Sequence, residues 1–78
     1  MKGEWFATLT NQYDMAVNLR LRAARVLRGM TQLQLAERVG RKEIEISRVE
    51  TGRSRPDALT KQRIADVLGR PAFEIFDC

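Results

Sequence analysis

Residues Thr31 to Gly52, TQLQLAERVGRKEIEISRVETG, decide the fold of this 78-residue chain. Thr31 suits the N-cap of a helix, because its hydroxyl can accept a hydrogen bond from a free backbone N–H of the first turn. Apolar residues then recur at helical spacing, at Leu35, Ala36 and Val39. Gly40 predicts the end of this helix, at about 32–39, because glycine readily adopts the positive φ that a sharp reversal demands.

A second helix is predicted at about 43–51, and Gly52 ends it. A helix-turn-helix needs a small residue where the two helices meet, a glycine in the turn and apolar residues on the inner face of the second helix. The chain provides these features in order at Ala36, Gly40, Ile46 and Val49. The spacing therefore predicts a helix-turn-helix, in which the second helix turns its other face outward.

At this register the sequence resembles the lambda-repressor and Cro-type (XRE) helix-turn-helix family. The resemblance runs from about Val17 to Phe76 and is carried by LRAARVLRGMTQLQLA, ISRVETG and IADVLG. These pieces are fairly specific in combination, although each is weak alone. The resemblance implies an all-α, five-helix DNA-binding domain over residues 12–78 and a function in the regulation of transcription.

The positive charge lies on the motif itself. The whole chain carries a net charge of +4, but Arg20 to Arg55 holds ten basic and four acidic residues, a net +6, which leaves −2 for the remainder. A basic surface of this kind is typical of proteins that bind a phosphate backbone. An arginine-rich surface that only contacts solvent is the weaker interpretation, because the charge coincides with the helix-turn-helix.

Composition argues against several other classes of protein. The chain has no histidine and a single cysteine, Cys78, so an intrachain disulfide, a metal cluster, a catalytic residue and a cofactor are not expected. No apolar run is long enough for a membrane span, and the N-terminus lacks the apolar core of a signal peptide. We expect a cytoplasmic protein without enzymatic activity.

Residues 1–11 lie outside the resemblance and form a predicted N-terminal arm. Its aromatic and alternating apolar residues suit a short strand that pairs with its copy in a second subunit. Alternatively, the end is frayed and Trp5 or Phe6 tucks against the helices. Asn11 and Asp14 then predict the start of a helix that runs to about Arg28. Its predicted inner face is Val17, Leu21, Ala24 and Leu27.

The resemblance implies specific roles for the residues around the motif. It predicts an ion pair between Arg25 and Glu50, the glutamate of the Glu-x-Gly element that ends at Gly52, and it leaves Arg25 a second role at a DNA phosphate. Gln32 is expected to bind a phosphate at a helix N-terminus, where free N–H groups favour an anion. The implied phosphate contacts are Gln32, Arg25, Arg53, Arg55, Arg41 and Ser47.

The base-reading positions implied by the resemblance are Lys42, Glu43, Ile44 and Arg48. Arg48 can bond both acceptors of a guanine, Glu43 can accept from a cytosine amino group, and Ile44 can contact a thymine methyl. Relatives mostly carry Ser, Thr or Asp near this N-cap, whereas lysine caps poorly. Glu43 and Glu45 would repel phosphates unless they were paired, so both are also interpreted as complements of the helix dipole.

Two further helices complete the predicted domain. Asp57 is the expected cap of a helix that runs to about Leu68, with Ile64, Ala65 and Leu68 as its core stripe. Lys61 falls on that stripe, so either the helix is rotated toward Leu59 and Val67 or the lysine extends along the edge of the core. A short last helix carries Phe73, Ile75 and Phe76, which line a dimer interface or complete the core of one subunit.

Two functions follow from these observations. The first is a transcriptional regulator, such as a repressor, that binds a palindromic double-stranded DNA operator as a homodimer, with recognition helices about 34 Å apart. The second is a protein-interaction module, such as an antitoxin that masks a toxin, in which DNA binding is secondary. The apolar N-terminus with Trp5 and Phe6 supports the second function.

Overall fold

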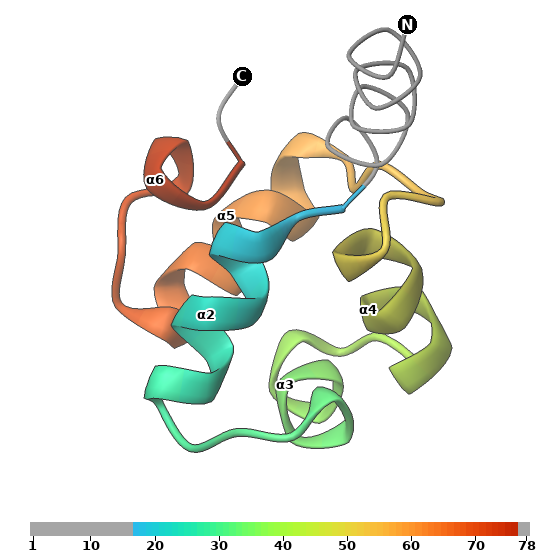
Figure 1. The fold of residues 1–78 in the computed structure, drawn as a ribbon, viewed down its shortest axis with the longest axis horizontal. Helices are drawn as coiled ribbons and strands as arrows, with labels where there is room; N and C mark the ends of the chain where they lie inside the picture. Colours follow the sequence, from blue (N-terminus) through green and yellow to red (C-terminus); the bar gives the residue numbers. More distant parts are fainter. Residues whose placement is uncertain (1–16, 77–78) are drawn as a thin grey trace, which may run out of the picture.

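The computed structural model describes residues 17–76. Five α-helices occupy this part of the chain, as shown in Figure 1: α2 (Leu19–Leu27), α3 (Gln32–Val39), α4 (Glu43–Glu50), α5 (Ala58–Leu68) and α6 (Ala72–Phe76). The described part has no strand, and none of its helices has the length and apolar character needed to cross a membrane. The predicted N-terminal strand and the residues Trp5 and Phe6 lie outside the described residues.

The predicted boundaries of α3 and α5 are confirmed by their caps. The Thr31 hydroxyl accepts a hydrogen bond from the backbone N–H of Gln34 at 3.0 Å, and the Gln34 side chain accepts from the Thr31 N–H at 2.9 Å. This reciprocal pair satisfies two donors at the start of α3. Asp57 caps α5 by accepting from the Thr60 N–H at 2.9 Å. Gly40 ends α3 with a φ of 79°, in the left-handed region that favours glycine.

The predicted start and inner face of the first helix need correction. The helix α2 begins at Leu19, where Asn18 accepts a hydrogen bond from the Leu21 N–H at 2.9 Å; Asn11 and Asp14 lie outside the described residues. Leu27 was expected on the inner face, but it is 73% exposed. Six residues rotate a helix by about 240°, so Leu27 cannot share the face of Leu21. The inner positions of α2 are Leu21, Ala24 and Arg25.

The helices enclose one hydrophobic core. α3 packs against α4 and α5, while α6 packs against α2 and α5. The buried apolar residues are Leu21, Ala24, Leu35, Ala36, Val39, Ile46, Val49, Ile64, Ala65, Leu68 and Ile75. This core confirms the predicted apolar stripes of α3, α4 and α5, and it fixes the outer face of α4.

The C-terminal helix divides its three large apolar residues between core and surface. Ile75 is buried and Phe76 packs partly buried against the core, whereas Phe73 is 71% exposed. Lys61 is half-buried, and its ammonium lies 5.7 Å from the centroid of the Phe76 ring. The lysine therefore extends along the edge of the core and gains a cation–π contact. The alternative, in which the helix is rotated toward Leu59 and Val67, is wrong for Leu59, which is exposed, although Val67 packs partly buried against the core.

Substitution of Gly69 by alanine is expected to destabilise the fold more than substitution of Gly29. Both glycines have a φ near 70°, so an alanine at either position costs about 1–2 kcal/mol of backbone strain. A Cβ at Gly69 would also lie 2.7 Å from the Arg28 guanidinium, whereas a Cβ at Gly29 meets nothing within 4 Å. The Arg28 Nη2, which donates to the Val67 carbonyl at 3.4 Å, would have to shift.

Urea unfolding of the two alanine variants measures this difference. Gly69→Ala should lose about 0.5–1.5 kcal/mol more than Gly29→Ala, the typical net value of a hydrogen bond. Equal losses would show that the Arg28 contact contributes nothing to stability.

Candidate nucleic-acid interface

Helix α4 presents one polar and cationic face to the surroundings. Its buried residues are Ile46, Val49 and Glu50. At about 100° per residue, Ile44 and Arg48 lie on the opposite side, one turn apart. Both are exposed. The Arg48 guanidinium makes no hydrogen bond or ion pair with residues 17–76, and Ile44 is an exposed large apolar residue in the first turn of α4. This face can therefore contact a partner without rearrangement of the core.

Glu45 stabilises the start of α4. Lys42 occupies the N-cap position, but an ammonium group has no acceptor, so its side chain cannot cap the helix. The Glu45 carboxylate instead accepts a hydrogen bond from the backbone N–H of Lys42 at 3.2 Å. Both glutamates of the first turn also complement the positive end of the helix dipole. The structural interpretation of Glu45 is thus favoured, while Glu43 and Lys42 are exposed at the start of the helix.

A buried polar network ties α4 to α2 and α3. The Arg25 Nε donates to Glu50 Oε2 at 2.5 Å, and its Nη2 donates to Oε1 at 3.2 Å. The Arg25 Nη1 donates to the Met30 carbonyl at 2.7 Å, and Gln32 Nε2 donates to Glu50 Oε1 at 3.0 Å. Among the described residues, no buried side-chain polar atom lacks a hydrogen-bond partner. A fully satisfied network of this kind fixes the orientation of the elements it joins.

The network bears on two of the expected phosphate contacts. Arg25 is only 8% exposed, and each of its three nitrogens donates to a protein oxygen. Its burial favours the structural role over a phosphate contact. Gln32 is half-buried at the first position of α3, where free backbone N–H groups favour an anion. Its amide is held in place by Glu50, so any anion bound there would meet a side chain with a fixed orientation.

The loop after α4 carries two exposed arginines, Arg53 and Arg55. Its start is anchored to α4, because the Arg48 carbonyl accepts from the N–H groups of Arg53 at 2.8 Å and Ser54 at 3.2 Å. Neither guanidinium is bonded to another part of the described chain. The loop therefore places two uncommitted positive charges directly after the outer face of α4.

Arg41 and Ser47 are more constrained than Arg53 and Arg55. The Arg41 Nη2 donates to the Thr60 hydroxyl at 3.0 Å, across the turn between α3 and α4. Hydrogen bonds from Thr60 hold the pKa of Asp57 below its ordinary value, and the positive charge of Arg41 contributes to the same shift. Arg41 is thus drawn toward the start of α5. Ser47 is half-buried on α4, and its carbonyl accepts from the Thr51 hydroxyl at 2.9 Å.

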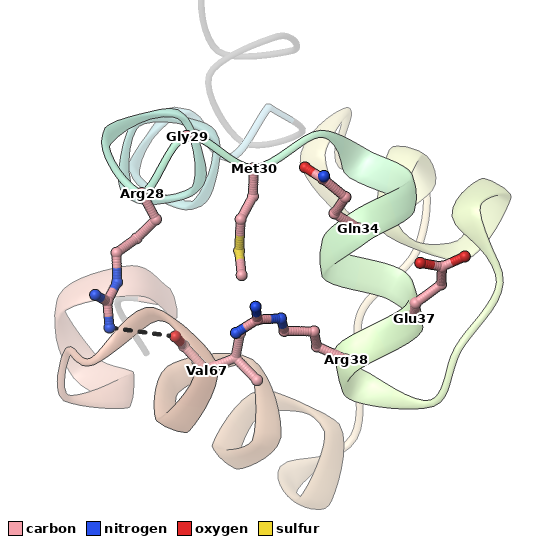
Figure 2. Close-up of a pocket in the computed structure, with 7 residues that line it drawn as sticks. All are labelled: Arg28, Gly29, Met30, Gln34, Glu37, Arg38 and Val67. Atoms are coloured by element: carbon pink, nitrogen blue, oxygen red, sulfur yellow. Dashed lines mark hydrogen bonds between the residues drawn. The ribbon is translucent and has the colours of Figure 1, made fainter.

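A polar pocket lies elsewhere, between the end of α2, α3 and α5 (Figure 2). It is lined by Arg28, Gly29, Met30, Gln34, Glu37, Arg38 and Val67. Figure 2 shows Arg38 and Met30 pointing into it, while Arg28 reaches the Val67 carbonyl at 3.4 Å. None of the predicted base or phosphate residues lines this pocket, so it is separate from the face of α4. The sequence motif gave no sign of it, because Arg28 and Val67 are far apart along the chain.

Comparison with known proteins agrees with this geometry. A family model described as Helix-turn-helix matches residues 21–75, from the first turn of α2 into α6. No curated protein and no solved structure matches the chain. The match covers more than half of the sequence and includes the whole of α3, the turn and α4. The predicted all-α fold is confirmed, and the chain belongs to the lambda-repressor and Cro-type (XRE) helix-turn-helix family of DNA-binding transcriptional regulators.

Proposed function

We propose that this protein is a sequence-specific regulator that binds a palindromic operator as a homodimer, with α4 in the major groove of each half-site. The observation that carries the proposal is the outer face of α4. Its Arg48 guanidinium has no partner within the described part of the chain and lies one helical turn from Ile44, opposite the buried side of the helix. A major groove accepts one α-helix, and both side chains suit the chemistry of base edges.

The proposed base contacts follow from that face. Arg48 donates to O6 and N7 of a guanine, and Ile44 packs on the methyl group of a nearby thymine. Glu43 and Lys42 lie at the start of the helix, where Glu43 accepts from a cytosine amino group and Lys42 contacts a neighbouring base. Glu45 takes no part in base reading, because its carboxylate serves the start of α4.

The proposed phosphate contacts surround α4. Arg53 and Arg55 neutralise the backbone on the side of the loop, and Gln32 binds a phosphate at the N-terminus of α3. Arg41 and Ser47 form secondary contacts at the edge of the groove. Arg25 acts indirectly, because its bond to Glu50 holds α4 and the neighbouring Gln32 in place.

A two-fold dimer explains how so small a chain achieves specificity. One recognition helix reads only a few base pairs, whereas two helices about 34 Å apart read successive major grooves. Symmetric proteins of this kind match palindromic DNA, since the two-fold axis of the protein coincides with that of the operator. The toxin-masking alternative depends on Trp5 and Phe6, outside the described residues, so the proposal includes no second protein partner.

Selection of bound sequences from a random pool of duplex DNA tests the proposal. We expect an enriched palindrome whose half-sites contain a guanine and a thymine and are centred about 10 base pairs apart. Enrichment of an asymmetric single site would overturn the two-fold arrangement. Recovery of no preferred sequence would overturn sequence-specific recognition.

Substitution of Arg53 by alanine is expected to lower the salt dependence of DNA binding. Loss of one phosphate contact should reduce the slope of log K against log salt by about one unit, without a change in sequence preference. The slope is measured by fluorescence anisotropy over a salt series. Arg38→Ala is the matched control, because Arg38 is an exposed arginine in the pocket that α4 does not line. Equal slopes for wild type and Arg53→Ala would remove Arg53 from the phosphate contacts.

A further inference from the structure

The polar pocket of Figure 2 has the size of a small-molecule site. Its volume is about 560 Å³, and pockets for small ligands range from about 300 to 1,000 Å³. Its lining comes from α3, α5 and the segment that follows α2, so three parts of the chain converge on it. We call it the α2–α3–α5 pocket. None of the residues proposed to contact DNA lines it, so operator binding does not account for it.

Arg28 presents a guanidinium to this pocket in a fixed orientation. Its Nε donates to the Leu68 carbonyl at 3.2 Å, and its Nη2 donates to the Val67 carbonyl at 3.4 Å. Both carbonyls belong to the last turn of α5, where the negative end of the helix dipole favours a cation. The Nη1 group makes no hydrogen bond with residues 17–76. Arg28 therefore keeps N–H donors for a ligand.

Gln34 and Arg38 add further donors from α3. The side-chain oxygen of Gln34 accepts from the Thr31 N–H at 2.9 Å, which orients the amide and leaves its Nε2 as a donor. Neither this Nε2 nor the Arg38 guanidinium makes a hydrogen bond or ion pair with residues 17–76. Figure 2 shows both groups on the side of α3 that faces the pocket. Three side chains thus offer N–H donors to one space.

The charges that line the pocket favour an anion. Arg28 and Arg38 approach Val67 from two sides in Figure 2, while Glu37, the one acidic residue of the described lining, points away from them. Two guanidinium groups in one pocket repel each other unless an anion lies between them. Each guanidinium fork matches two oxygens of a phosphate group. Met30 and Val67, both half-buried, add apolar contact area beside the donors.

We propose that the α2–α3–α5 pocket binds a small phosphomonoester. The phosphate lies between Arg28 and Arg38, within reach of the Gln34 amide, and the carbon body lies against Met30 and Val67. A phosphomonoester suits this donor set, because it has three acceptor oxygens and a charge close to −2 at neutral pH, which balances two guanidinium groups. The pocket is separate from the face of α4, so one subunit binds the small molecule and DNA at the same time.

Nuclear magnetic resonance titration of the isotope-labelled full chain with phenyl phosphate tests the proposal. At about pH 7.5, where the phosphate is doubly charged, and at constant ionic strength, we expect saturable shifts at the backbone amides of Met30, Gln34 and Val67. Inorganic phosphate should bind about threefold more weakly or worse, because it has no ring to cover the apolar residues. Phenol should cause no shift. Equal affinity for the two phosphates, or shifts confined to the loop after α4, would overturn the site.

Three variants that each lower the net charge by one identify the donors. Arg38→Ala should raise the dissociation constant for phenyl phosphate about tenfold, a typical loss for hydrogen bonds to a charged group. Gln34→Glu should do the same, because a carboxylate keeps the helix cap at Thr31 but repels the phosphate. Arg63→Ala is the matched control, since Arg63 is an exposed arginine on α5 outside the pocket lining. Equal losses in Arg63→Ala and Arg38→Ala would show that only net charge matters and would overturn the site.

Duplex DNA distinguishes a free phosphomonoester from the DNA backbone as the source of the phosphate. The salt slope of DNA binding should be the same for wild type and Arg38→Ala, and phenyl phosphate should still shift the pocket amides when the chain is saturated with DNA. A lower slope in Arg38→Ala would assign the pocket to the DNA backbone and overturn the small-molecule site. Because the titration contains no DNA, failure of the pocket leaves operator recognition by α4 intact, and the reverse also holds.

Discussion

Replacement of Glu50 by alanine lowers the free energy of unfolding by about 3–5 kcal/mol, the expected cost of leaving one member of a buried ion pair without its partner. Arg25 would keep its positive charge at 8% exposure, with only the Met30 carbonyl as a remaining acceptor. Gln32 would also lose its bond to Oε1. Because small domains have a total stability of about 5–15 kcal/mol, the variant should be at the edge of folding. Urea unfolding monitored by circular dichroism measures the change.

Two comparisons isolate the buried charge as the cause. Glu74→Ala breaks the Arg70–Glu74 pair, which is 3.5 Å long with both side chains almost half exposed. Exposed pairs of this spacing contribute about 0.3–0.5 kcal/mol, so the loss should be close to the limit of measurement. Glu50→Gln keeps the side-chain carbonyl as an acceptor and should lose less than Glu50→Ala. If Glu50→Ala and Glu74→Ala cost the same, the network does not hold α4 to α2 and α3.

The helix boundaries were predictable because their causes are local. The caps at Thr31 and Asp57 each use a backbone N–H three residues along the chain, and the left-handed turn at Gly40 depends on one residue. Signals of this range are visible in any window of the sequence. The same holds for the inner residues of α4, because Ile46 and Val49 are three residues apart.

The first helix, α2, shows where prediction from short-range sequence signals fails. The predicted inner face followed apolar residues at intervals of four, three and three from Val17 to Leu27. Small errors in helical phase accumulate over these ten residues. A charged residue, Arg25, occupies the inner position that an apolar pattern would not assign to it. Its burial is possible only because Glu50, 25 residues away, supplies the opposite charge. The ion pair was expected from the family resemblance, since no local pattern indicates it.

The polar contacts of the candidate site were the least predictable. Gln32 meets Glu50 over 18 residues, and Arg41 meets Thr60 over 19. Each bond depends on how the helices pack, so sequence spacing contains no direct signal for it. The unusual first turn of α4 is a partial exception. A carboxylate three residues after the N-cap is a recognised helix-start pattern, and Glu45 fulfils this role.

Replacement of Arg48 by alanine should weaken binding to the selected operator by about 1–3 kcal/mol per half-site and relax the preference at one base pair. The expected cause is loss of two hydrogen bonds to a guanine, because the guanidinium makes no hydrogen bond or ion pair with residues 17–76. The fold should be unaffected. The bonds from Arg53 and Ser54 reach the backbone carbonyl of residue 48, which alanine retains, and the side chain points away from the core.

Arg48→Lys distinguishes base reading from simple charge. Lysine keeps the positive charge but lacks the rigid pair of donors that matches O6 and N7. Binding to random DNA should therefore remain close to wild type in Arg48→Lys, while the preference for the guanine declines. Competition assays at constant salt, with operators that differ only at this base pair, measure the preference. If both variants lose affinity equally on operator and random DNA, Arg48 contacts the backbone and the outer face of α4 reads the groove through Ile44 and Glu43.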